Sequence, residues 1–204
     1  NGGGIYNSGS LSIVNSTIAW NTAFQVGGAL YLDAVSYSLD YETATATLEN
    51  VTIAYNNAYD LAGGIFYDTG VISFQGTLLG RNSYGPGGFE HNDFYANYGG
   101  GVFIDSGYNL VEYSNVDWFS STSDIIGPQA NLFASSRPSD NGGWTLSLAL
   151  HQDSNAIDAG VPDGETTDQR GFGANGTRDI GAYEYLGIVA TNGSNEYSSI
   201  QSAI

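Results

Sequence analysis

The sequence predicts an all-β solenoid, and three observations lead to this prediction. First, a phrase of two or three glycines followed by apolar and aromatic residues recurs, opening at residues 2, 27, 63 and 99. Second, the steps between these openings are 25, 36 and 36 residues, a length typical of one solenoid repeat. Third, the apolar residues between the phrases alternate or form short blocks, as in strands, without the 3.6-residue spacing of a helix. We therefore expect a right-handed parallel β-helix.

The first three coils are predicted within residues 1–84. Each opens on consecutive glycines, which permit the positive φ of a tight corner. Later in each coil an asparagine occupies the same place, and asparagine tolerates the left-handed conformation and hydrogen-bonds to nearby backbone. We expect a ladder of hydrogen-bonded asparagines that joins the coils, formed by Asn21, Asn56 and Asn82.

Aromatic residues close the glycine-led phrases and are expected to stack on one another from coil to coil. This aromatic column is predicted to contain Tyr6, Tyr31 and Tyr67, with Phe103 as its fourth member. Apolar strand residues are expected to face inward, because a coil buries its apolar side chains only against its neighbours. The expected inward residues are Ile5, Leu11, Ile13, Ile18, Leu30, Leu48, Val51, Ile53, Ile65, Ile72, Phe74, Leu78, Val102 and Ile104.

Residues 1–118 are therefore assigned to β-helix coils, with a turn-rich insert at 85–98 and a fourth coil at 99–118. After Trp118 the glycine-led phrase stops, and residues 119–185 contain Asp, Gly and Pro with only short apolar stretches. The end of a solenoid exposes unpaired strand edges and apolar side chains, which must be covered. We predict that residues 119–185 form irregular coils and a C-terminal cap.

Six short motifs in the second half of the chain occur in a fixed order: 106–110 (SGYNL), 124–127 (DIIG), 140–143 (DNGG), 156–160 (AIDAG), 167–172 (TDQRGF) and 179–185 (DIGAYEY). Together they resemble the C-terminal part of the choice-of-anchor Q family. The preceding coils resemble the β-helical repeats that this family shares with polymorphic outer-membrane proteins, so the resemblance covers about residues 2–185. It implies a secreted bacterial surface protein with a pectate-lyase-like β-helix and a variable C-terminal anchor, and it implies no particular reaction.

Residues 186–204 depart from that family pattern, because no sorting signal follows. This tail resembles the start of another β-helix, in which a strand leads into a capping helix. Residue 1 falls inside a coil, so we expect the chain to be a piece of a longer protein. The tail is expected to be a linker or to dock on the open first coil of a neighbouring module, which would give a stalk or filament. The alternative is that the ordered region simply stops at both ends.

The composition limits the partners of the chain. With 21 acidic and 4 basic residues the formal net charge is −17, and clustered Lys and Arg for nucleic acid or anionic membranes are missing. No apolar run reaches the length of a membrane span, and the absence of Cys excludes disulfides and thiolate metal sites. The scarcity of basic residues and the lack of Met suit an extracellular protein. The acidity has two open interpretations, solubility or attraction of divalent cations.

A calcium site in the cap is one such hypothesis, although no cofactor is required by the sequence. Five carboxylates crowd a short stretch of the cap, and hard oxygen ligands are those that Ca²⁺ binds. Their spacing matches no EF-hand loop. The candidate ligands are Asp153, Asp158, Asp163, Glu165 and Asp168.

Arginine–carboxylate pairs are expected to stabilise the same segment, which lacks the hydrogen-bond ladders of a sheet. The members of this predicted clamp are Asp168, Arg170, Arg178, Asp179 and Glu184. The alternative is that these arginines bind an anion or a sugar acid. Nothing around them is basic enough to favour that alternative.

Catalytic constellations are missing from the sequence. His91 and His151 lie 60 residues apart without a partner at ligand spacing, and no Gly-x-Ser-x-Gly elbow occurs. The stretch Glu90-His91-Asn92 stands where polygalacturonase-like enzymes carry Gly-His-Gly, and the first 80 residues contain no Lys or Arg to act as a lyase base. We therefore expect no enzymatic activity, with a polysaccharide lyase or hydrolase as the alternative.

Exposed aromatic residues leave a binding role open. Tyrosines in a coil usually pack the ring against the core and expose the hydroxyl group to solvent. The alternative is that these rings form a platform that binds sugar rings. The candidate platform contains Trp20, Tyr31, Tyr37, Tyr41, Tyr55 and Tyr59. The function we expect is that of a non-catalytic extracellular or bacterial cell-surface module, structural or adhesive, whose partners are its own copies or neighbouring modules. A polysaccharide-binding module is the second hypothesis.

Overall fold

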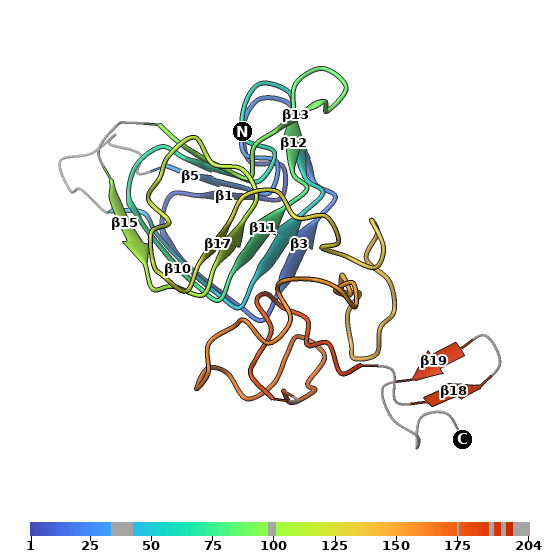
Figure 1. The fold of residues 1–204 in the computed structure, drawn as a ribbon. Helices are drawn as coiled ribbons and strands as arrows, with labels where there is room; N and C mark the ends of the chain where they lie inside the picture. Colours follow the sequence, from blue (N-terminus) through green and yellow to red (C-terminus); the bar gives the residue numbers. More distant parts are fainter. Residues whose placement is uncertain (34–42, 98–100, 175, 188–189, 193–194, 198–204) are drawn as a thin grey trace.

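The protein is all-β in the computed structural model, which describes residues 1–33, 43–97, 101–174, 176–187, 190–192 and 195–197 (Figure 1). Strands, and no helix, occur in these residues. Accordingly, this part of the chain contains no helix that is long and apolar enough to cross a membrane. The architecture therefore rests on strand pairing and on loops.

Most strands belong to four sheets, named A to D here, in which strands from successive parts of the chain pair in parallel. Sheet A contains β1 (Ile5–Asn7), β5 (Leu30–Leu32), β9 (Ile65–Tyr67) and β14 (Phe94–Ala96). Sheet B contains β2 (Ser10–Val14), β6 (Thr45–Glu49), β10 (Val71–Gln75) and β15 (Val102–Asp105). Sheet C contains β3 (Thr17–Ala19), β7 (Thr52–Ala54), β11 (Leu78–Gly80), β16 (Leu110–Val111) and β17 (Ile125–Ile126).

Sheet D contains β4 (Thr22–Ala23), β8 (Asn57–Ala58) and β12 (Ser83–Tyr84), to which β13 (Glu90–His91) adds in the antiparallel sense. The chain passes through sheets A, B, C and D in this order three times, and each pass is called a rung. Rung 1 is β1–β4, rung 2 is β5–β8 and rung 3 is β9–β12. Rung 4 consists of β14, β15 and β16. The expected stacking of parallel strands is confirmed.

The core lies between the sheets and is built from side chains in register. Leu30, Leu48 and Ile53 of rung 2 are at most 1% exposed, and each is paired with a rung 1 residue of the same kind. Successive residues of a strand point to opposite faces of the sheet, so every second residue of a strand faces the core. In sheet C both faces are covered, because Leu79 packs into this core whereas Leu78 belongs to a second cluster on the outer face.

The fourth glycine-led phrase does not open a coil. Val102 begins β15, which pairs with β10 in sheet B rather than with sheet A. Val102 and Ile104 are 54% and 43% exposed, whereas Phe103 packs against the core. The inward assignment of Val102 and Ile104 was therefore wrong by one residue. The inward assignment of Leu78 was wrong in the same way, because its neighbour Leu79 faces the core. The fourth strand of sheet A is instead β14, inside the segment expected to be an insert, where Phe94 pairs with Ile65.

The aromatic column is present with two members changed. In sheet A, Tyr6 pairs with Tyr31, Tyr31 with Phe66, and Phe66 with Tyr95, and their ring centroids are 5.3, 5.3 and 5.4 Å apart. Tyr67 points into the core instead and is 1% exposed, so its assignment to the column was wrong, as was that of Phe103. The reason is that Gly64, the second glycine of the third phrase, lies level with Ala29, so that Phe66 and not Tyr67 pairs with Tyr31.

The close approach of neighbouring rungs, more than a positive φ, explains why glycines are required in these phrases. Gly27 has a positive φ of 67°, as expected, but Gly28 and Gly63 do not. A Cβ atom on Gly28 would collide with the carbonyl oxygen of Gly63, and one on Gly63 would collide with the backbone of Ser83. Neighbouring rungs pack so closely at this corner that only glycine fits.

An aromatic plug closes the core at rung 4. Phe103 lies 4.9 Å from Phe119 and 5.4 Å from Trp118 between ring centroids, and Phe119 also contacts Phe74 and Phe94. These residues, with Val116, pack against the core. The end is thus covered just where the predicted coils stop, around residue 118.

Phe119 and β17 continue the rung stack, whereas residues 128–185 lie along the side of the rungs and not over their end, which differs from the expected position of a cap. The segment packs on the outer face of sheet C through a cluster that includes Leu110, Leu132 and Ile180 (orange in Figure 1). The side chain of Asn15 in rung 1 donates to the carbonyl oxygen of Thr167 at 2.8 Å, and Gly181 N donates to Gly76 O at 2.8 Å. This lateral segment, as it is called below, therefore ties rungs 1 to 4 together.

The tail contains a short antiparallel hairpin, β18 (Ala190–Asn192) and β19 (Asn195–Tyr197). The capping helix expected at the end of the tail falls mainly on residues 198–204, outside the described residues.

Truncation of the plug tests this account of the core. Phe119→Ala removes a buried ring from a cluster of five aromatic residues, and we expect the free energy of unfolding to fall by about 3 kcal/mol. Urea denaturation measures the change. Phe24→Ala is the matched control, because Phe24 is 84% exposed. Equal stability of the two variants would contradict the plug.

Candidate functional site

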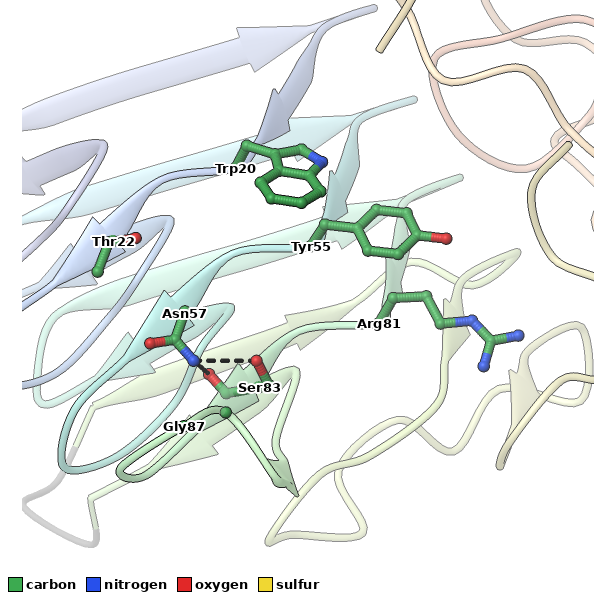
Figure 2. Close-up of a pocket in the computed structure, with 8 residues that line it drawn as sticks. Trp20, Thr22, Tyr55, Asn57, Arg81, Ser83 and Gly87 are labelled. Atoms are coloured by element: carbon green, nitrogen blue, oxygen red, sulfur yellow. Dashed lines mark hydrogen bonds between the residues drawn. The ribbon is translucent and has the colours of Figure 1, made fainter. Parts of the chain in front are cut away.

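A groove follows the corner between sheets C and D. Each rung turns this corner through a residue with positive φ, namely Trp20 (61°), Tyr55 (56°) and Arg81 (62°). The left-handed residue is thus the one before each ladder asparagine, and the expectation that the asparagines themselves adopt this conformation was wrong. The three side chains form one column along the rungs in Figure 2.

The groove has a volume of about 380 Å³ and is lined by two columns of side chains. The lining residues are Trp20, Thr22, Tyr55, Asn57, Arg81, Ser83, Gly87 and Gly88. Thr22, Asn57 and Ser83 form the polar column, in which Asn57 Nδ2 donates to Ser83 Oγ at 3.0 Å. The groove therefore combines rings on one side with neutral hydrogen-bonding groups on the other.

The ring faces in the groove are already in contact with other protein groups. Trp20 and Tyr55 stack with ring centroids 6.2 Å apart and an interplanar angle of 20°. Arg137 Cζ lies 4.8 Å from the centroid of Trp20, and Phe133 lies 5.6 Å from Tyr55. Trp20 Nε1 also donates to Ser136 O at 2.7 Å. A sugar ring would therefore meet ring edges, unless the lateral segment moves.

The guanidinium of Arg81 is held by the protein as well. Its Nη2 donates to Gln129 O at 2.5 Å, and its Nε lies 3.7 Å from Glu112 Oε2. The same carboxylate oxygen accepts a hydrogen bond from Arg81 N at 2.8 Å. Because a carboxylate balances the charge of Arg81, the groove suits a neutral polar ligand better than an anion.

The four residues of the predicted aromatic platform that the structure describes do not form one surface. Trp20 and Tyr55 line the groove, whereas Tyr31 belongs to the column on sheet A. Tyr59 stacks on Phe24 with centroids 5.8 Å apart, and both rings are exposed. Tyr37 and Tyr41 lie outside the described residues.

The asparagine ladder runs through the rungs behind the groove. Asn21 Nδ2 donates to Asn56 Oδ1 at 2.9 Å, and Asn56 Nδ2 donates to Asn82 Oδ1 at 2.9 Å. The backbone N–H groups of Asn21 and Asn56 donate to the same two oxygens. Every step therefore has the same direction, with the donor in the earlier rung and the acceptor in the later one.

The ladder ends on Asp93, a residue that sequence reasoning missed. Asp93 Oδ1 accepts from Asn82 N and Asn82 Nδ2 at 2.9 and 2.7 Å, and Oδ2 accepts from Tyr113 N at 2.9 Å. Three donors converge on the side chain, so a carboxylate, which only accepts, satisfies all of them. Asp93 follows Asn82 by 11 residues, a spacing that no other step of the ladder shares.

Burial acts against the charge of Asp93. Complete burial raises the pKa of Asp93 from 3.8 to about 7, although the hydrogen bonds from Asn82 and Tyr113 act in the opposite direction. Two carboxyl groups at rung 4, Asp105 and Asp124, were also missed by sequence reasoning, and their pKa values shift in opposite directions. Burial raises the pKa of Asp124 to about 6, while backbone hydrogen bonds from Ser120, Gly107 and Ser121 hold the pKa of Asp105 below its usual value.

The predicted clamp is divided between two arginines with different partners. Arg170 Nε and Nη2 both lie 2.7 Å from Asp168 Oδ2, and Nη2 also donates to Glu184 O at 2.5 Å. The guanidinium lies over the ring of Tyr183 at 3.7 Å, a cation–π contact. Arg170 therefore joins three parts of the lateral segment.

Arg178 binds carbonyl oxygens and not a carboxylate. Its Nη1 donates to Glu165 O and Thr167 O at 2.5 and 2.8 Å, and its Nη2 to Asn15 Oδ1 at 3.3 Å. Asp179 accepts instead from backbone, with Asp158 N at 2.8 Å and Tyr185 N at 2.5 Å. Burial raises the pKa of Asp179 to about 7 and also raises the pKa of Glu184, which accepts from Asp179 N.

The five calcium candidates do not converge. No group of three or more His, Cys, Asp or Glu side chains that could hold a metal ion occurs among the described residues. Asp168 uses both oxygens for Arg170, Phe172 and Glu184. Asp153, Asp163 and Glu165 are exposed. The calcium hypothesis therefore stays a prediction without a ligand set in this part of the chain.

The two histidines lie in separate places. His91 stacks on Tyr113 with ring centroids 5.1 Å apart, and His151 Nδ1 lies 3.7 Å from Asp153 Oδ2. Neither lines the groove.

Comparison with models of known families, with curated proteins and with solved structures found no match to this chain.

Removal of one side-chain donor from the ladder tests whether the ladder stabilises the fold. In Asn56→Asp, an oxygen replaces the Nδ2 group that donates to Ile18 O, Ala54 O and Asn82 Oδ1. The buried acceptors then face one another, so we expect the free energy of unfolding to fall by about 3 kcal/mol or more. Chemical denaturation measures it. Asn131→Asp on the exposed surface is the control, and a similar small effect for both would disprove a stabilising ladder.

The buried carboxyl groups predict an unusual dependence of stability on pH. Asp93, Asp124 and Asp179 have folded-state pKa values above their unfolded values, so their contribution is complete below about pH 4 and is lost as the pH rises towards 7. We expect the Tm to be higher at pH 5 than at pH 8, by roughly 5 °C or more. Calorimetry at both pH values measures the difference. A higher Tm at pH 8 would show that these groups are ionised at little cost.

Proposed function

We propose that this chain is a non-catalytic structural or adhesive module, a right-handed parallel β-helix of an extracellular or bacterial cell-surface protein. The observation that carries the proposal is that the reactive polar side chains are engaged in holding the rungs together. Asn56 and Asn82 join rungs, Asp93 ends their ladder, and Arg170 and Arg178 hold the lateral segment. Groups that are engaged in this way are poor acids, bases or ligands.

Two further features support this assignment. Crossovers between parallel strands of one sheet are right-handed in nearly all proteins. The chain connects parallel strands of one sheet from each rung to the next, so we expect these connections to be right-handed. The net charge of −17 keeps an exposed module soluble and suits the extracellular location that the choice-of-anchor Q resemblance implies. Modules of this kind that meet end to end would build a stalk or filament.

Carbohydrate binding in the groove is a second candidate, which the groove itself favours. Thr22, Asn57 and Ser83 present neutral polar groups in line along the rungs, and a polysaccharide is a linear ligand with hydroxyl groups at regular spacing. The ring edges of Trp20 and Tyr55 would form the apolar side. This arrangement offers binding without the acid and base that hydrolysis requires.

Incubation of the purified protein with uronans and neutral polysaccharides tests the structural function. We expect no increase in reducing or unsaturated ends, because no carboxylate lines the groove, and Glu112 and Asp93 are held by Arg81 and by the ladder. Turnover that is abolished by substitution of one acidic residue would overturn the proposal.

Retention on immobilised neutral polysaccharide separates the two candidates. The structural module passes through the column unretained. Retention that Asn57→Ala abolishes, and that Asn131→Ala preserves, would instead favour the groove as a carbohydrate site.

A further inference from the structure

Two carboxyl groups from different strands meet at rung 4. Asp105 is the last residue of β15, and Asp124 stands directly before β17. The N–H of Ser121 donates to Asp105 Oδ2 at 2.9 Å and to Asp124 Oδ2 at 3.2 Å, so the two oxygens share one donor. The two side chains are also hydrogen-bonded to each other. A hydrogen bond between two carboxyl groups requires a proton, because a carboxylate only accepts.

The surrounding donors decide which of the two groups carries this proton. Asp105 also accepts from Ser120 N at 3.0 Å, Gly107 N at 2.9 Å and Asn109 Nδ2 at 3.0 Å. Asp124 accepts in addition only from Asn109 N, at 2.8 Å, among the described residues. Donors favour the ionised form of the group that accepts from them, so Asp105 is the carboxylate and Asp124 is the acid.

The pKa values agree with this division. Burial acts against the charge of Asp105, but its backbone hydrogen bonds outweigh burial and hold its pKa below the usual value. Burial, together with the neighbouring Asp105, raises the pKa of Asp124 to about 6.

No basic side chain neutralises the pair. The sequence contains no Lys, and Asp117, in the same loop, is a further exposed acid. The basic residues all lie in the described part of the chain and have the partners given above. They are Arg81, Arg137, Arg170, Arg178, His91 and His151.

The loop that the pair holds is the one that carries the aromatic plug. Ser120 and Ser121, which both donate to Asp105, directly follow Trp118 and Phe119. Phe119 is 7% exposed and packs on the core. A change in the charge of the pair therefore acts on the segment that closes rung 4.

We propose that Asp105 and Asp124 form a proton-sharing latch, which fastens the plug to rung 4 in mildly acidic solution and loosens it when the pH rises. Without the shared proton, two negative charges face each other and no cation lies between them. The loop at 120–124 then moves away from β15, and the plug becomes the pH-sensitive part of the fold. This inference goes beyond the proposed structural function and does not depend on it.

The latch has a limit on each side of its pH range. The folded-state pKa of Asp124 is raised from 3.8 to about 6, so its contribution is complete below about pH 4 and is lost as the pH rises through 6. The folded-state pKa of Asp105 is lowered, so its contribution is present above about pH 4 and is lost as the pH falls further. The latch is therefore tightest between about pH 4 and pH 6.

Hydrogen exchange of the Ser120 and Ser121 amides tests the latch, because both donate to Asp105. The exchange rates at pH 5 and pH 8 are divided by the rates of the unfolded chain, which gives protection factors. We expect the protection factors of these two amides to fall roughly tenfold or more from pH 5 to pH 8. The amides of β10 report unfolding of the whole protein and serve as the internal reference.

Three variants separate a shared proton from ordinary hydrogen bonding. Asp124→Asn replaces the acid by an amide of the same shape that donates at every pH, so Ser120 and Ser121 should keep at pH 8 the protection they have at pH 5. Asp105→Asn removes the ionised acceptor and should lower their protection at both pH values. Asp163→Asn, on the exposed surface, should leave the pH dependence as it is.

Two results would overturn the latch. One is protection of Ser120 and Ser121 that stays equal at pH 5 and pH 8, or that falls only as far as the protection of β10. The other is an Asp124→Asn variant that keeps the original pH dependence or loses protection as Asp105→Asn does. In that case both carboxyl groups would be simple acceptors that share no proton.

Discussion

The asparagine ladder is the constraint on which the rest of the fold depends. Asn56 and Asn82 each accept two hydrogen bonds from the preceding asparagine and donate to the next ladder residue, so the first three rungs must place their asparagines at the same height and in the same orientation. The left-handed residue before each asparagine turns the chain at this corner and directs Trp20, Tyr55 and Arg81 outward. The core, the ladder and the groove are therefore set by one repeated turn.

The lateral segment extends this constraint to the outer face of sheet C. Arg170 and Arg178 hold backbone carbonyl groups that have no strand partner, and Asn15 and Thr52 connect the segment to rungs 1 and 2. Sheet C is thereby covered on both faces. A long irregular stretch can be stable in this position because its hydrogen bonds go to charged or buried partners.

The sequence predicts the repeats well because their chemistry is local. Glycines that permit close rungs and asparagines that form the ladder recur within each coil, so strands, register and core follow from the pattern. The pattern fails at rung 4, where β14 has no glycine-led phrase and Gly101 leads into sheet B instead. Tyr67 was misplaced because the glycines of the third phrase lie one position nearer to the strand than those of the second, so that Phe66 and not Tyr67 pairs with Tyr31.

The candidate site was less predictable than the fold. Trp20 and Tyr55 could be proposed as exposed rings, but their stacking on Arg137 and Phe133 joins residues more than 75 positions apart. The pairing of Arg170 with Asp168 spans two residues and could be expected, whereas Arg178 reaches Asn15 across 163 residues. Contacts that depend on where a loop returns leave no local pattern in the sequence.

Exchange of the asparagine side-chain amide protons with solvent tests the ladder most directly. Nuclear magnetic resonance can follow the Nδ2 protons of Asn21, Asn56 and Asn82 in the native protein. The account predicts slow exchange for Asn56 and Asn82, which are fully buried and hydrogen-bonded on both sides, and faster exchange for Asn21, which is only partly buried. Rapid exchange at all three positions, equal to that of the exposed Asn131, would contradict it.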